Sequence, residues 1–341
     1  MFKRKIKLVM LLICVGLFVL LIKEAGPSLI ASRVYDVGAG FLVLILISGS
    51  RHLLRTAAWF YSIERQERRV RFRDLFAIRI AGDAITDLTF LGPLLGETVK
   101  GITLSKHVAA EHSASSVVVE NLAYTFAVGL LVVTGLVLFL LEYPLPSSVL
   151  AGTLITMGAL LLSGVLVGMA VKKRYRVAGR ILDRLQGLNL RWVERLRDKR
   201  EKIVQFEENV YSFWHAHKAA SVWILFLEIM SIFVGIIEAW VILYLTAHHT
   251  SLFAAFMVET VNRVVNLFFA FVPMRIGVDE GGAALMLNTI GYGAAEGVSL
   301  AIIRKIRMLF WVTVGLIIAS RYSLSSKKDG KKDPPVVAAS K

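Results

Sequence analysis

The sequence predicts an all-α polytopic membrane protein with about six full transmembrane helices and two re-entrant hairpins of broken helices, arranged as an inverted repeat. Three observations support this class. Hydrophobic residues make up 56% of the 341-residue chain and charged residues only 19%, outside the usual balance of a soluble domain. The apolar runs are long and do not alternate, which favours helices over a β-barrel. The basic residues behind the net charge of +15 lie between these runs, so membrane topology explains them better than a nucleic-acid partner does.

Composition also narrows the chemistry. The single cysteine, Cys14, lies inside an apolar run, which excludes an intramolecular disulfide and argues against a thiolate metal site. The sequence contains no HExxH, CxxC or GxSxG motif and no glycine-rich phosphate loop. We therefore expect a protein that is not an enzyme and that uses no cofactor and no metal.

Six apolar runs are long enough, or nearly so, to cross the hydrocarbon layer of a bilayer. They cover residues 8–22, 37–61, 117–141, 149–171, 219–245 and 298–320. The first run follows a basic start, as in a secretory signal, but Lys23 and Glu24 close it, and we expect an uncleaved helix. Two further stretches, 75–107 and 252–290, are apolar but interrupted by Gly, Pro and charge, which a simple crossing helix tolerates poorly.

The positions of the basic clusters predict the orientation. The clusters at 3–7, 65–73, 172–176 and 327–332 are all expected on the cytoplasmic side, together with both termini, in a prokaryotic cytoplasmic (inner) membrane. The six runs satisfy this only if each interrupted stretch enters and leaves on the same side. The stretches are therefore predicted to be re-entrant hairpins that approach each other from opposite leaflets.

The order of helix, broken hairpin and helix occurs twice within a membrane domain at 1–322, in a first repeat at 37–141 and a second at 219–320. A short likeness supports the repeat, because Pro93, Gly96 and Glu97 recur loosely as Pro273, Gly277 and Glu280. The alternative is that a cluster of Pro, Gly and acid arose independently in two membrane loops. In an inverted repeat, the substrate site lies near the midplane at the discontinuous helices.

Two other segments lie outside the repeats. Segment 172–218 is strongly basic, with apolar residues at roughly helical spacing, and is predicted to be a cytoplasmic amphipathic segment on anionic headgroups. An ordinary loop helix is the alternative. The tail at 323–341, rich in Lys, Asp and Pro, is predicted to be disordered and cytoplasmic.

Ionisable residues at membrane depth are the candidate binding residues, since each costs about 2.5–3.5 kcal/mol at a helix centre and so needs a partner or a wet cavity. In the first hairpin, Arg79, Asp83 and Asp87 share one helix face, and Glu97 and Lys100 follow the break. The alternative is internal pairing of Arg79 with Asp83.

The second hairpin carries Glu259 and Arg263 before its break, and Arg275, Asp279 and Glu280 within it. An acid at the start of the returning helix is explained by capping. A cation at that place is unfavourable unless an anion binds there too, and a lipid phosphate is such an anion.

The last helix contains Arg304, Lys305 and Arg307 where topology disfavours cations. Their candidate partners are Glu228, Glu238 and Glu259, and the alternative is a wet cavity for an anionic headgroup. The residues Glu120, Asn121 and Tyr124 are expected to complete the same cavity.

Two segments resemble a known family. The first resembles the pattern PxxxGE-x-x-basic and reads GPLLGETVKGITLSKH here. The second resembles the pattern PGGLGxxEG with a trailing arginine helix, and reads FVPMRIGVDEGGAALMLNTIG followed by IIRKIRMLFWVTVGL. In the second segment MRIG replaces GGLG. Both segments occur in the lysylphosphatidylglycerol synthase transmembrane-region family, the flippase-like domain of multiple-peptide-resistance factor. The resemblance covers most of residues 37–320. Its motifs correspond to Pro93, Gly96, Glu97, Lys100, Pro273, Arg275, Gly277, Glu280, Arg304 and Arg307.

The resemblance implies a lipid translocator without the synthase domain. Its expected partners are membrane lipids with anionic or zwitterionic headgroups, and a lipid-synthesising protein is a further candidate. Three other classes remain open on the sequence: a secondary transporter of a small polar solute or ion, a membrane-embedded transferase using Asp83, Asp87 or Glu280 as acid or base, and a non-transporting partner subunit.

Overall fold

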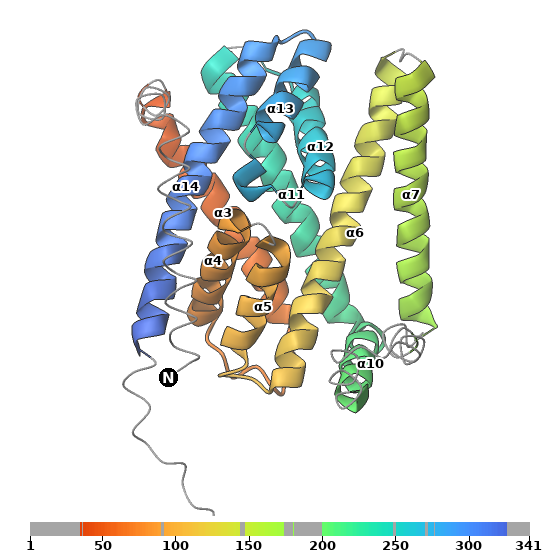
Figure 1. Ribbon diagram of the computed structural model, residues 1–341, viewed down its shortest axis with the longest axis vertical. Helices are drawn as coiled ribbons and strands as arrows, with labels where there is room; N and C mark the ends of the chain where they lie inside the picture. The colour runs from red at the N-terminus through yellow and green to blue at the C-terminus, as the bar shows by residue number, and fades with distance from the viewer. Residues whose placement is uncertain are drawn as a thin grey trace, which may run out of the picture.

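A computed structural model describes residues 35, 37–89, 92–143, 147–173, 180, 200–247, 250–269, 272–275 and 277–325 as an upright bundle of helices (Figure 1). The first half of the chain forms α3 (Gly40–Ser62), α4 (Phe72–Leu88), α5 (Gly92–Leu104) and α6 (Ala110–Glu142). Helices α7 (Ser147–Lys172) and α10 (Arg200–Ala216) follow. The second half forms α11 (Lys218–Ala247), α12 (Leu252–Phe268), the 3-10 turn η1 (Pro273–Arg275), α13 (Val278–Thr289) and α14 (Ala294–Ser325). All these elements are helical, which confirms the all-α prediction for the described residues.

Four helices of the described part are long and apolar enough to cross a membrane, namely α3, α6, α11 and residues Leu150–Lys172 of α7. They correspond to four of the six predicted runs. The run at 8–22 lies outside the described residues, as do most of segment 172–218 before α10 and the tail after Ser325. The sixth run lies in α14, which extends along the bundle in Figure 1 but carries three cations in its first half.

Both interrupted stretches form pairs of short helices, as predicted. Helices α4 and α12 have 17 residues each, α5 has 13 and α13 has 12. At about 1.5 Å per residue these helices are roughly 18–26 Å long, shorter than the ~30 Å hydrocarbon layer. In Figure 1 the α4–α5 pair occupies the lower half of the bundle and the α12–α13 pair the upper half. The two tips meet, because Met274 packs in one apolar cluster with Ala84, Leu88, Leu309 and Val312.

The first break depends on glycine at close contacts. A Cβ on Gly92 would lie 1.9 Å from the carbonyl oxygen of Thr86, and one on Gly96 would lie 1.8 Å from Thr86 Oγ1. Because any larger residue would collide there, these glycines allow α5 to fold back against α4.

The second break depends on the backbone instead. Met274 and Arg275 have φ of 50° and 48°, and Gly277 has φ of 82°. Left-handed conformations are costly for residues with a Cβ, so this tip is held by the packing around Met274.

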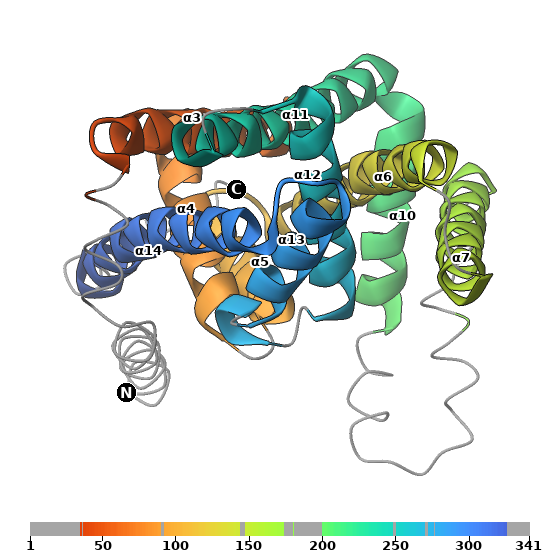
Figure 2. The same cartoon turned by 90° about the horizontal axis from the view of Figure 1, so that it is seen from above.

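The packing pairs of the first half have counterparts in the second. Helices α3 and α11 lie side by side along one edge of the bundle (Figure 2). Helix α4 of the first half packs on α14, and α12 of the second half packs on α6. Both crossings are close at a glycine: Gly315 of α14 lies against Ile80, and Gly135 of α6 lies against Thr260.

Two helices lie at the periphery. Helix α7 packs on α6, and none of its membrane-length window is buried. Helix α10 buries Val210, Tyr211 and Phe213 in a cluster with Ala58 and Ile224. Burial, and then a 2.9 Å hydrogen bond to Glu207, raise the pKa of the Tyr211 phenol to about 12.

Candidate functional site

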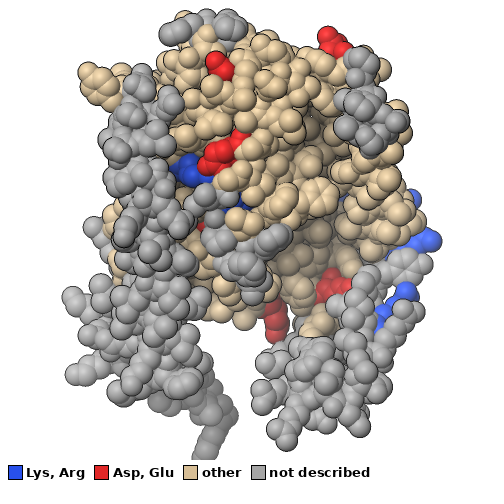
Figure 3. Space-filling view, turned by 45° about the horizontal axis from the view of Figure 1, so that its top comes forward, with Lys and Arg blue, Asp and Glu red and all other residues tan. Residues whose placement is uncertain are grey.

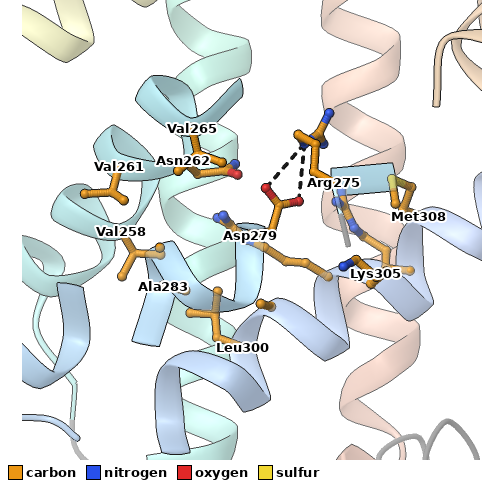
Figure 4. A pocket seen from close by; sticks show the side chains of 14 residues that line it. Val258, Val261, Asn262, Val265, Arg275, Asp279, Ala283, Leu300, Lys305 and Met308 are labelled. Atoms are coloured by element: carbon orange, nitrogen blue, oxygen red, sulfur yellow. Dashed lines mark hydrogen bonds and ion pairs between the residues drawn. The ribbon is translucent and has the colours of Figure 1, made fainter. Parts of the chain in front are cut away.

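A polar cavity of about 60 Å³ lies between α12, α13 and α14, next to the tip of the second hairpin (Figure 4). Its polar lining consists of Arg275, Arg304, Lys305 and Arg307 with the acid Asp279 and the amide Asn262. The rest of the lining is Val258, Val261, Val265, Gly282, Ala283, Leu300, Ala301 and Met308. At ~10–15 Å³ per water, the cavity holds a few water molecules.

Each cation of the cavity has one carboxylate partner. Arg275 donates to Asp279 at 3.3 Å, the pair drawn with dashed lines in Figure 4. Arg307 pairs with Glu238 at 3.0 Å, and Lys305 pairs with Glu280. The cavity is therefore lined by ion pairs, and an incoming anion would compete with their carboxylates.

Glu259 is the centre of the network in the second half. It is 1% exposed and accepts hydrogen bonds from Arg304, at 2.7 Å, and from Arg263. Arg304 also donates to the backbone oxygen of Gly235 at 3.3 Å. One buried carboxylate is thus the shared partner of two guanidinium groups, and its loss would leave both without a carboxylate.

The first half has its own network around Glu120, which is 2% exposed. Glu120 accepts from Arg79 at 2.6 Å and from Arg55 at 3.0 Å, and Arg55 also lies 3.4 Å from Glu228. Next to it, Lys100 bridges the two acids Asp83, at 2.6 Å, and Glu97, at 2.9 Å.

Tyr124 joins the two networks. Its hydroxyl oxygen accepts a 2.7 Å hydrogen bond from Arg263, and the guanidinium of Arg55 lies 3.9 Å from the centre of its ring. Polar contacts therefore continue from the first hairpin to the second through the middle of an otherwise apolar bundle.

The two networks occupy corresponding positions with opposite charges. Arg79 lies seven residues after the start of α4, and Glu259 lies seven after the start of α12. Their partners Glu120 and Arg304 each lie ten residues after the start of α6 and of α14, at 2.6 Å and 2.7 Å. The i+4 neighbours, Asp83 and Arg263, are also exchanged in sign. Two halves with the same plan thus carry the same ion-pair triad with its charges reversed.

The expected pairings are confirmed in part. Glu259 and Glu238 are partners of Arg304 and Arg307 as anticipated, whereas Glu228 pairs with Arg55. Arg79 lies 3.8 Å from Asp83 but much closer to Glu120, so pairing within the first hairpin is its weaker contact. Capping also occurs, because Glu280 accepts from the backbone nitrogen of Gly277 at 2.8 Å.

The predicted site residues do not all share one cavity. Arg275, Asp279, Arg304 and Arg307 line it. Glu259, Arg263 and Glu280 pair with or beside these residues, while Arg79, Asp83, Glu97 and Lys100 form the separate network of the first hairpin. Asp87 makes no hydrogen bond or ion pair with the described residues. Sequence analysis missed three polar residues of α3, namely Arg51, His52 and Arg55. Their charge inside a predicted apolar run could have identified them as candidates.

Figure 3 shows one face of the molecule, on which most of the described atoms belong to uncharged residues. In Figure 3 one patch of adjoining blue and red atoms interrupts a mostly tan upper face. Among the described residues, no group of three or more His, Cys, Asp or Glu could hold a metal ion.

Long apolar helices, two opposed hairpins and a polar network at their junction define a polytopic helical membrane protein with an internal polar site. Residues 7–316 match the family described as Lysylphosphatidylglycerol synthase TM region, and the chain belongs to this family of membrane proteins related to lipid handling. Comparison with curated proteins and with solved structures gives no match.

Proposed function

We propose that this protein is a lipid translocator that moves a phospholipid, or another lipid with a polar headgroup, between the two leaflets of a prokaryotic cytoplasmic membrane without modifying it. The observation that carries the proposal is the cavity at the second hairpin, where four cations lie within an apolar bundle. A headgroup phosphate is the anion that such a site recognises in a membrane. The family match adds support, since its description refers to a lipid-modifying system.

In this proposal the two hairpins are re-entrant, and the two halves form an inverted repeat with the C-terminus in the cytoplasm. The short hairpin helices, the matched packing pairs and the corresponding triads support this arrangement. Inverted repeats with discontinuous helices permit alternating access, because the two halves can exchange conformations around a central site.

Ion-pair exchange would admit the headgroup. Arg275 and Asp279 form the most exposed pair of the cavity, with side chains 24% and 16% exposed. A phosphate can replace Asp279 as the partner of Arg275, and the freed carboxylate can then bind an ammonium group or a proton. Arg304 and Arg307 would hold the phosphate further in, and Glu280 and Glu97 would face a cationic part of the headgroup. Because the cavity now holds only a few waters, the hairpins must move apart for the headgroup to enter.

Reconstitution tests this proposal. Purified protein in vesicles with a fluorescent phospholipid should make the inner-leaflet label accessible to an external quencher, and Arg275→Ala should slow this exchange about tenfold or more. The matched control is Arg73→Ala, which removes an exposed arginine from the start of α4. If wild-type protein moves no labelled phospholipid or polyprenyl lipid, the proposal fails. A chemically altered lipid, detected by mass spectrometry, would instead indicate a transferase.

A second candidate is a transporter of a small anion, and the volume of the cavity favours it specifically. Such a protein would pass an inorganic anion across sealed vesicles and leave the labelled lipid in place. Flux of labelled phosphate in the same vesicles separates the two functions.

A further inference from the structure

Arg51 of α3 has no counter-ion in the described part of the chain. No described side chain or backbone group forms a hydrogen bond or an ion pair with it, whereas the cations of both networks each have at least one carboxylate. Its side chain is only partly exposed, and Arg55, one turn further along the same helix, pairs with two glutamates. A partly buried guanidinium without a partner is costly, so its presence needs a reason.

Arg51 points to the residue that Arg304 also contacts. One of its terminal nitrogens lies 3.6 Å from where a Cβ of Gly235 would stand, and Glu259 Oε1 lies 3.0 Å from the same point. The absence of a side chain at Gly235 leaves room for Arg51 and Glu259, and Arg304 donates to the carbonyl oxygen of the same glycine. Two guanidiniums, from α3 and from α14, thus approach one point on α11.

The local charges do not balance at this point. Three guanidiniums, those of Arg51, Arg263 and Arg304, lie around the single carboxylate of Glu259, which forms ion pairs with Arg263 and Arg304 only. The next acid, Glu238, is already the partner of Arg307. The excess of two positive charges adjoins the cavity, since Arg304 belongs to this group and also lines the cavity.

We propose that Arg51 is an anion-binding residue that completes, with Arg304 and Arg307, a site for a phosphate-bearing anion. The bound anion supplies the negative charge that this part of the protein lacks. Phosphate fits because its oxygens accept several charge-assisted hydrogen bonds at once and guanidinium groups match its geometry. This inference rests on the proposed function only in one respect, the source of the phosphate. That source is either a lipid headgroup or the free ion.

The test compares Arg51 with Arg55, its paired neighbour. Without added ligand, Arg51→Gln should unfold in detergent at the same temperature as wild type or higher, because it removes an unpaired charge. Arg55→Gln should unfold at a lower temperature, because it leaves Glu120 and Glu228 without their shared cation. A lower unfolding temperature for Arg51→Gln would show that Arg51 is neutralised within the protein and would overturn the proposal.

Binding is measured with two probes, phosphatidylglycerol in nanodiscs and inorganic phosphate in detergent. Arg51→Gln should weaken the binding of at least one probe about 10-fold to 100-fold, and Arg51→Lys should restore part of the loss. The control is Arg73→Gln, which removes an exposed arginine and should leave binding unchanged.

The probe that responds identifies the source of the phosphate. Unchanged affinity for both probes in Arg51→Gln would overturn the site. Binding that depends on Arg51 in a protein that moves no lipid would refute the translocator and leave the anion site standing.

Discussion

The two ion-pair triads occupy corresponding positions but expose opposite charges. In the first half the acids face outward, with Asp83 22% and Glu97 28% exposed, while Arg79 is 0% exposed. In the second half the cations Arg304 and Arg307 are 13% and 15% exposed, while Glu259 and Glu238 are 1% exposed. A ligand would therefore meet mainly carboxylates at the first hairpin. At the second it would meet guanidiniums together with the carboxylates of Asp279 and Glu280, which are 16% and 21% exposed. The backbone plan fixes where the charged groups lie, and the sequence of each half decides their sign.

The largest expected effect is the loss of the central acid in the second half. Glu259→Gln should lower the free energy of unfolding by about 3–5 kcal/mol, since Arg263 and Arg304 lose the carboxylate they share. Glu120→Gln should cost clearly less, because Arg55 keeps Glu228 and Arg79 keeps Asp83. Unfolding of the purified proteins in mixed micelles measures both changes. Equal losses of stability would show that Glu228 and Asp83 do not compensate for the loss of Glu120.

Reversing a pair in the first half tests whether the two triads are interchangeable. Arg79→Glu and Glu120→Arg should each be strongly destabilising, whereas the double variant copies the charge order of Glu259 and Arg304 and should recover part of the loss. We expect a coupling energy of about 1–3 kcal/mol from the four unfolding free energies. No recovery would mean that neighbours such as Arg55 fix the sign at these positions.

The sequence predicted the helices better than the contacts between them. The apolar runs and the Gly and Pro interruptions predicted four of the described crossing helices and both broken hairpins. The sequence also predicted that Arg304 and Arg307 need either acidic partners or a wet cavity, because a cation at membrane depth is costly without one of them. The pairing of Arg79 with Glu120 was not predicted, since it joins residues 41 positions apart on different helices.

The correspondence between the two triads could not be predicted from the sequence either. It becomes visible only when the helix starts are known, and α6 begins at Ala110, before the apolar run that was expected to start it at residue 117. Arg51 and Arg55 were overlooked for a related reason. Their run was apolar enough on average to be taken as a plain crossing helix.

The two glycine crossings offer a weaker comparison of the halves. Gly315→Ala would place a Cβ 2.6 Å from the carbonyl oxygen of Ile80, and Gly135→Ala would place one 2.3 Å from Thr260 Oγ1. Backbone cannot rotate away as a side chain can, so Gly315→Ala should be the more destabilising, with both costs at about 1–3 kcal/mol. Thermal unfolding in detergent ranks them. The reverse order would indicate that α14 moves from α4 more easily than α12 moves from α6.

The smallest expected effect distinguishes the contribution of the backbone conformation at Arg275 from that of its side chain. Arg275→Ala and Arg275→Gly both remove the cation that pairs with Asp279, so lipid exchange should slow equally in the two variants. Their stabilities should differ, because φ at this position is 48° and glycine adopts that conformation without the penalty of a Cβ. Arg275→Gly should therefore be more stable than Arg275→Ala by about 1 kcal/mol in unfolding experiments. A difference in exchange rate with equal stability would mean that the strained turn itself takes part in moving the headgroup, and that the guanidinium is not its main contribution.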